Sequence, residues 1–165
     1  MIRIIKDSDQ WKEVLQQCKY HDSYHTFEYH KLSRSQEEYP YLFVYEYEDI
    51  IIALPLLLRD IKGSNFKDAT SVYGYAGPAY NAELIDEKVV LGFTADLEKV
   101  LLEMNIISVF SRLHSYFPQQ LQILHNLGKL VRAGQLVYID LKQPTDIQRA
   151  KYNNRLKTQI NKLRR

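Results

Sequence analysis

Two adjacent segments constrain the fold more than any other part of this chain. In YLFVYEYED, residues 41–49, apolar and polar residues alternate, whereas IIIALPLLL, residues 50–58, is apolar throughout. Alternation is typical of a strand, and a short continuous apolar run is typical of a buried strand. With a turn at Glu48-Asp49, the two segments predict a β-hairpin. The apolar run is too short to cross a bilayer, so we predict no transmembrane segment, and Pro55 predicts a bulge or an unpaired position.

Helical and strand patterns continue on both sides of this hairpin. We expect helices over 8–18, 25–38, 82–105, 117–128 and 144–165, and strands or extended segments over 2–5, 70–74, 106–114, 129–134 and 136–141. The resulting order, β-α-α-β-β-β-α-β-α-β-α, predicts an α/β (α+β) fold. Helices should flank a mixed sheet.

The single cysteine and the N-terminus bear on location. Cys18 has no second cysteine to pair with, and we expect it to be a small buried hydrophobic residue on a helix. The first apolar residues are interrupted by Arg3 and Lys6, unlike a secretory signal peptide. We therefore expect a cytoplasmic protein.

Tyrosines and glycines are concentrated in DATSVYGYAGPAY, residues 68–80. Gly74 and Gly77 permit a positive φ and the close approach of another backbone or a ligand, and Pro78 constrains the exit. Tyr73 and Tyr75 would then flank a turn at the end of a strand. The segment is either the wall of a substrate groove or a tight turn whose tyrosines pack on neighbouring residues.

FSRLH, residues 110–114, places Arg112 and His114 two residues apart in an expected strand. Side chains at that spacing share one face of the strand. The pair therefore predicts an anion or carboxylate site, for which arginine is well shaped. The alternative is a solvated strand end.

Histidines follow Cys18 at positions 21, 25 and 30. Their spacing matches no standard zinc pattern, so we predict no metal site. Instead we expect an aromatic-rich loop, with His25 beside the cap of the second helix and within reach of Asp22.

The C-terminal segment is strongly basic. The net charge of the chain is +2, but residues 1–146 carry 15 basic and 20 acidic residues, and residues 147–165 carry seven basic residues and no acidic one. A rough apolar stripe runs through Ile147, Ala150, Leu156, Ile160 and Leu163. The basic residues lie mostly off this stripe and form either a solvated face or a site for nucleic acid or a phosphate-bearing ligand.

Common catalytic motifs are missing. The sequence contains no G-x-S-x-G, no Walker loop, no G-x-G-x-x-G and no H-E-x-x-H. These residues alone identify no catalytic group.

Six segments, taken in order, resemble a known family. They are YHDSYHTFEYH, IALPLLLRDI, DATSVYGYAGP, SVFSRLHSYF, GQLVYIDL and NNRLKTQINK. Together they look like the N-terminal half of FemAB-like proteins, which have the N-acetyltransferase-like (GNAT) fold and include the aminoacyltransferases that build peptidoglycan interpeptide bridges. The resemblance extends over essentially all 165 residues.

The resemblance implies a GNAT-like N-terminal domain over residues 1–143, with a mixed, mainly antiparallel sheet flanked by helices. It also implies a basic helix over residues 144–165 that leads to a second, similar half. Such proteins are transferases that place an aminoacyl or acyl group on an amine of a cell-wall precursor or similar acceptor. This half would bind the acceptor and no cofactor. Aminoacyl-tRNA or acyl-CoA would be the donor in the full protein, and the half alone would be inactive.

The same resemblance implies roles for individual residues. The acceptor would lie against Tyr73, Gly74, Tyr75, Gly77, Pro78, Arg112, His114 and His25. Arg155, Lys157 and Lys162 would meet phosphate or tRNA. The alternatives are a stand-alone CoA-dependent N-acetyltransferase, for which KLVRAGQ lacks the usual pyrophosphate loop, and a non-enzymatic binding module that uses the basic helix.

Overall fold

The structure, a computed structural model, describes residues 1–164. Its contacts divide the chain into two compact units, residues 1–130 and 131–165. The boundary between the units lies before residue 143, where we expected the N-terminal domain to end. That residues 144–165 lead to a second half stays a prediction. In the described part of the chain, no helix is both long and apolar enough to cross a membrane.

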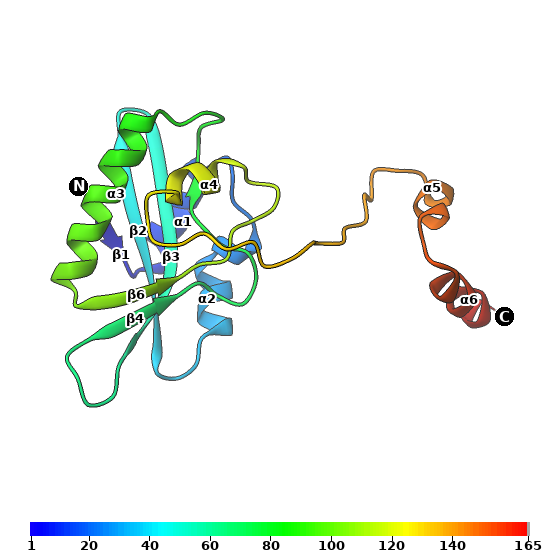
Figure 1. The fold of residues 1–165 in the computed structure, drawn as a ribbon, viewed down its shortest axis with the longest axis horizontal. Coiled ribbons are helices and arrows are strands. Elements are labelled where there is room, and N and C mark those ends of the chain that lie inside the picture. The colour runs from blue at the N-terminus through cyan, green and yellow to red at the C-terminus, as the bar shows by residue number, and fades with distance from the viewer. Residues whose placement is uncertain (165) are drawn as a thin grey trace. The chain divides into compact units, whose positions relative to one another are not determined.

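The first unit is built on an open, mostly antiparallel sheet (Figure 1), which confirms the predicted fold class. The strand order is β1-β2-β3-β4-β6, with β5 pairing β3, and only β4 and β6 are parallel. The strands are β1 (Arg3–Ile5), β2 (Glu38–Tyr47), β3 (Ile50–Asp60), β4 (Lys67–Thr70), β5 (Ala79–Tyr80) and β6 (Ile106–Phe110). The helices of this unit are α1 (Ser8–Gln17), the 3₁₀ turn η1 (Ser23–His25), α2 (Phe27–Ser33), α3 (Glu87–Glu103) and α4 (Gln119–Leu124).

Two hydrophobic clusters lie on opposite faces of the β2–β3 hairpin. Phe43 and Leu54 belong to a cluster with Phe93 of α3 and Ile123 of α4. Leu42, Val44 and Ala53 belong to a second cluster that contains Trp11, Val14 and Leu15 of α1. Because both faces are covered, β3 has no side that could accept polar residues, and this explains the uninterrupted apolar run of the sequence.

Pro55 sits in β3 without a bulge. Its pairing with β2 is continuous, Leu42 opposite Pro55, so the bulge alternative is wrong. On the other side of β3, β5 pairs Ile52 and Ala53, and β4 begins to pair at Leu57. Pro55 therefore occupies the gap between β5 and β4, which agrees with the alternative of a locally unpaired position.

Two strands end earlier than the sequence predicts. β4 covers Lys67–Thr70 instead of 70–74, and β6 ends at Phe110 instead of 114. The Ser71 amide still donates to the Phe110 carbonyl at 2.7 Å, but the Arg112 amide donates to the Ser71 hydroxyl at 3.2 Å. The Ser71 side chain thus replaces the backbone hydrogen bonds of the ladder at this point, and both strands, β4 and β6, end there.

The second unit contains two short helices, α5 (Thr145–Ala150) and α6 (Asn154–Leu163). The prediction of one helix over 144–165 is therefore wrong between Lys151 and Asn153. Asn153 has extended backbone angles, and its side chain accepts the Leu156 amide at 2.9 Å, so it caps a new helix. Residues 136–141 are in no strand.

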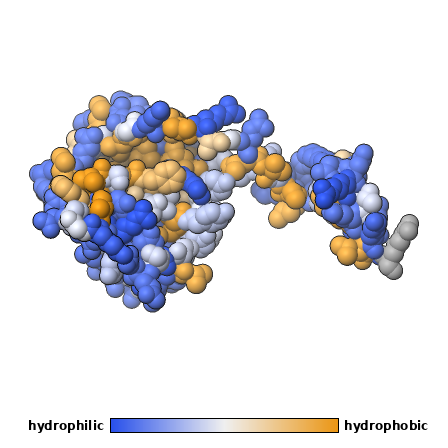
Figure 2. Space-filling model, turned by 60° about the horizontal axis from the view of Figure 1, so that its bottom comes forward, coloured by the Kyte–Doolittle hydropathy of each residue, from blue (hydrophilic) through white to orange (hydrophobic). Residues whose placement is uncertain are grey.

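Figure 2 shows one face of the molecule, coloured by hydropathy. Hydrophobic and hydrophilic side chains are intermixed over residues 1–130. In the second unit, neither α5 nor α6 contains a buried residue. Leu156 and Leu163, from the predicted apolar stripe, are both exposed.

We predict that amide hydrogens of residues 155–163 exchange rapidly in the isolated chain. A ten-residue helix without buried side chains is marginal in water. Exchange followed by NMR should be complete in α6 while the amides of β3 remain protected. Protection of α6 equal to that of β3 in a monomeric sample would contradict this expectation.

Candidate functional site

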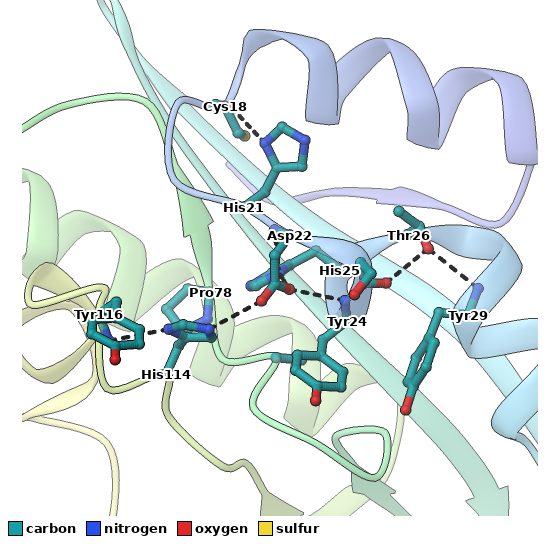
Figure 3. Close-up of polar contacts among 12 residues, drawn as sticks. Cys18, His21, Asp22, Tyr24, His25, Thr26, Tyr29, Pro78, His114 and Tyr116 are labelled. Atoms are coloured by element: carbon teal, nitrogen blue, oxygen red, sulfur yellow. Dashed lines mark hydrogen bonds and ion pairs between the residues drawn. The ribbon is translucent and has the colours of Figure 1, made fainter. Parts of the chain in front are cut away.

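Three segments that are distant in the sequence meet beside the end of β6. They are residues 22–25 around η1, the loop 71–78 and the segment 111–117 (Figure 3). Arg112 and His114 lie in this last segment, after the strand, so the prediction that they share a strand face is wrong. The geometry of the cluster comes from side-chain contacts instead.

Asp22 is the polar centre of the cluster. Its Oδ1 lies 3.0 Å from His25 Nδ1, and its Oδ2 lies 3.0 Å from His114 Nε2. Asp22 also caps η1 by accepting the Tyr24 amide at 2.8 Å. The Asp22 amide also donates to His25 Nδ1 at 3.1 Å, which completes a capping box, so Asp22 contacts two imidazoles, of which His25 is fully buried. The predicted Asp22–His25 pair is present, and His114 is an additional partner.

The contacts of His114 determine its neutral tautomer. The Tyr116 amide donates to His114 Nδ1 at 3.1 Å, so Nδ1 is an acceptor. The proton of the neutral ring is therefore on Nε2, from which it is donated to Asp22. The ring also stacks on Phe117, with centroids 4.1 Å apart. Both nitrogens of His114 are thus occupied by groups of the protein.

The pKa values in this cluster follow from burial and from these contacts. Burial lowers the pKa of His114, the nearby Asp22 carboxylate acts in the opposite direction, and His25 lowers it further. For Asp22, burial acts to raise the pKa, but the hydrogen bonds and charge of His25 and the Tyr24 amide outweigh it, so the pKa is lowered. Asp22 is accordingly an anion at neutral pH, and His114 is a neutral donor to it.

Gln120, at the start of α4, organises the loop 71–78. Its side chain is fully buried, and its Nε2 donates to the carbonyls of Ala76 at 2.8 Å and Pro78 at 2.9 Å. Its Oε1 accepts the His114 amide at 2.6 Å. No pattern in the sequence indicates this residue, because a single glutamine in a helical segment gives no signal of burial.

The two glycines of the loop face side chains of the protein. Gly74 and Gly77 both have positive φ, of 133° and 55°. A Cβ on Gly74 would overlap the Tyr24 ring, and one on Gly77 would lie 2.6 Å from Cδ of Gln120. Pro78 is buried as well. The side chains of Tyr24 and Gln120, and not a ligand, therefore occupy the space beside these glycines. This agrees with the second alternative, a tight turn packed on neighbouring residues.

Tyr73 and Arg112 form the exposed part of the cluster. Tyr73 is 81% exposed, and the Arg112 guanidinium carbon lies 5.6 Å from the centre of its ring and 5.8 Å from that of Phe110. Tyr75 is half-buried, with its ring at the edge of His114 and Tyr24. Within residues 1–164, Arg112 has no carboxylate within ion-pair distance. The carboxylate of this cluster, Asp22, contacts His114 instead.

A second buried histidine, His30, lies behind this cluster. Its Nδ1 donates to the Thr26 carbonyl at 2.9 Å, and its ring lies against Trp11 with centroids 5.2 Å apart. The Nε2 atoms of His25 and His30 are buried and have no hydrogen-bond partner among the described residues. Burial lowers the pKa of His30 to about 4, with a smaller contribution in the same direction from His25.

The described residues offer neither a cluster of metal ligands nor a reactive thiol. Among residues 1–164, no group of three or more histidine, cysteine or acidic side chains could hold a metal ion. Cys18 is buried, as predicted, but it follows α1 with extended backbone angles instead of lying on the helix, and burial raises its pKa to about 12. Its thiol is therefore protonated at neutral pH.

Arg155, Lys157 and Lys162 belong to the second unit. Arg155 and Lys162 are exposed on α6, and Lys157 Nζ donates to the Ala150 carbonyl at 3.0 Å. Arg149 donates a hydrogen bond to Asn161 and so links α5 to α6. Phosphate or tRNA binding by the three basic residues stays a prediction.

Comparisons with protein-family models, with curated proteins and with solved structures give no match for this chain. The resemblance to FemAB-like proteins therefore rests on the motifs alone.

We predict that Gly77→Ala destabilises the first unit more than Gly63→Ala does. Both glycines have positive φ, so both variants lose about 1–2 kcal/mol from backbone strain. Only Gly77 lies against a buried group, and displacing Gln120 would leave unpaired carbonyls, at a further cost of about 1–3 kcal/mol. Urea unfolding measures both free energies. Equal losses would show that Gln120 moves aside at no cost.

We also predict that acid destabilises the fold through His30. Its folded pKa of about 4 lies below the usual value near 6.5, so the unfolded chain binds more protons between these values. The free energy of unfolding should fall as the pH is lowered from 6.5 to 4, by up to about 3 kcal/mol.

Unfolding of His30→Phe and of the exposed-site control His125→Gln, followed from pH 7 to 4, tests this assignment. The control should keep the full pH dependence, and His30→Phe should lose the part that His30 contributes, leaving the part that arises from the lowered pKa of His114. If His30→Phe does not fold, NMR titration of the wild-type His30 ring gives the same answer. A ring that protonates near pH 6.5 would contradict the prediction.

Proposed function

We propose that the first unit is the acceptor-binding half of a FemAB-like aminoacyl or acyl transferase. The acceptor would be an amine of a cell-wall precursor or a similar molecule. The observation on which this proposal depends is the rim formed by Tyr73 and Arg112 above the Asp22–His114 pair. The order of motifs in the sequence supports the same proposal.

Arg112 is suited to hold an anionic group of the acceptor. Its guanidinium lies over two aromatic rings, is exposed, and has no carboxylate partner in the described part of the chain. Arginine binds carboxylate and phosphate with two parallel hydrogen bonds. The exposed ring of Tyr73 would contact the apolar part of the same ligand.

The Asp22–His114 pair would hold the residues of this rim in position, and His114 would not act as a base. Because His114 already donates to Asp22 and accepts from the Tyr116 amide, it has no nitrogen available for a substrate proton. Its edge contact with the Tyr75 ring instead helps to orient that ring, two residues from Tyr73. Transfer to an amine would then depend mainly on placing the amine against an ester or thioester carbonyl.

The remaining parts of the reaction are assigned to the full protein. The second half, reached through residues 144–165, would complete the cleft, and aminoacyl-tRNA or acyl-CoA would be the donor. Arg155, Lys157 and Lys162 would meet its phosphates. The full protein would act in the cytoplasm, where such donors are made.

Binding of a soluble cell-wall stem peptide with a free side-chain amine tests the proposal. Titration of the chain, followed by NMR, should shift amides of residues 71–78 and 111–114. We predict that Arg112→Gln weakens this binding at least about tenfold, that is, by about 1.4 kcal/mol. Arg112→Lys should recover only part of the affinity, because lysine lacks the planar fork.

The control is Arg132→Gln, which removes an exposed arginine of the second unit and should bind as the wild type does. No shift of the wild-type amides at millimolar peptide, or equal affinity of wild type and Arg112→Gln, would overturn the proposal. Tight binding of acetyl-CoA would favour the stand-alone N-acetyltransferase instead.

A further inference from the structure

A basic hollow lies away from this site, between α2 and the edge of the sheet. It has a volume of about 400 Å³ and is lined by Lys6, Phe27, Lys31, Arg34, Tyr39, Pro40 and Tyr41. Lys6 follows β1, Phe27 and Lys31 are on α2, Arg34 ends α2, and the last three are on β2. We name this set of residues the α2–β2 hollow.

The α2–β2 hollow is lined by three cationic side chains and by no acidic one. Within residues 1–164, none of the three has a carboxylate within ion-pair distance, although other lysines and arginines of the unit do, such as Lys19 and Arg59. Of the acidic residues close to these cations in the sequence, Glu28 on α2 forms no ion pair with Lys31 within the described residues, and Glu37 lies 3.3 Å from Lys62. Asp7 caps α1, and Glu38 accepts the Ser35 amide and lies 3.6 Å from Arg59.

Aromatic rings hold two of the cations in place. Lys6 Nζ lies 4.5 Å from the centre of the Tyr41 ring, and the Arg34 guanidinium carbon lies 5.9 Å from that of Tyr39. Arg34 also donates to the Glu38 carbonyl at 2.7 Å. Tyr39 remains 54% exposed, so a large part of its ring is open to a ligand.

We propose that the α2–β2 hollow binds a phosphate ester that carries a flat ring, such as a mononucleotide. Lys6, Lys31 and Arg34 would neutralise the phosphate, for which arginine offers paired donors. Tyr39 and Phe27 would contact the ring by stacking and apolar packing. The volume is within the range of small-molecule sites. Nothing in this proposal depends on Arg112 or on transferase activity.

The test is calorimetric titration of the chain with adenosine 5′-monophosphate, inorganic phosphate and adenosine at low salt. The nucleotide should bind at least tenfold more tightly than phosphate or adenosine alone, and its affinity should fall as salt is added. Equal affinity for phosphate and nucleotide, or no binding of the nucleotide at millimolar concentration, would overturn the proposal.

Variants locate the site. Lys31→Gln, at an exposed position, should weaken nucleotide binding at least fivefold, whereas Lys99→Gln, an exposed lysine of α3, should leave it unchanged. Tyr39→Ala should reduce the preference for nucleotide over phosphate. Equal affinities of wild type, Lys31→Gln and Tyr39→Ala would place the nucleotide elsewhere and refute the assignment.

A further titration with a single-stranded octanucleotide distinguishes the two ligands that carry a phosphate and a flat ring, a nucleic-acid strand and a free nucleotide. Affinity at least tenfold above that of the mononucleotide would assign the hollow to a nucleic-acid strand. Similar affinity would assign it to a free nucleotide. Both outcomes, together with the Lys31→Gln effect, support recognition of phosphate and ring.

Discussion

Burial of the β2–β3 hairpin on both faces is the constraint on which the rest of the first unit depends. α3 and α4 cover one face, and α1 covers the other, so β3 cannot expose a side without placing leucine or isoleucine in water. The open sheet then extends from this hairpin to β1 on one side and to β4 and β6 on the other. The candidate site lies beside the end of β6, where the backbone ladder of the sheet stops.

At the end of β6, buried polar groups take over from the sheet ladder. Gln120 satisfies two loop carbonyls and one amide, and Asp22 joins two histidines. Each of these groups would be costly to bury alone, so the network specifies one arrangement of the loop. That arrangement leaves Tyr73 and Arg112 at the surface. A rigid base beneath an exposed ring and guanidinium is the physical reason why this rim is a candidate for binding.

The two proposed sites use cations in the same manner. In each, a guanidinium or ammonium group lies over an aromatic ring and has no carboxylate partner within the described residues. An acidic partner would occupy the donors that an anionic ligand needs. The sites differ in what surrounds them, a rim above a polar network in one case and a hollow beside α2 in the other. Binding to one is therefore measurable independently of the other.

Local patterns in the sequence determined the hairpin, the helix that carries Trp11 and the burial of Cys18, because period and turn residues act over a few neighbours. They also indicated the Asp22–His25 pair. Only the tertiary structure decided where β4 and β6 end, that Asp22 reaches His114, and that Gln120 rather than a ligand fills the space beside Gly77. Those outcomes depend on contacts between residues some 40 to 90 positions apart, and no local pattern encodes such a contact.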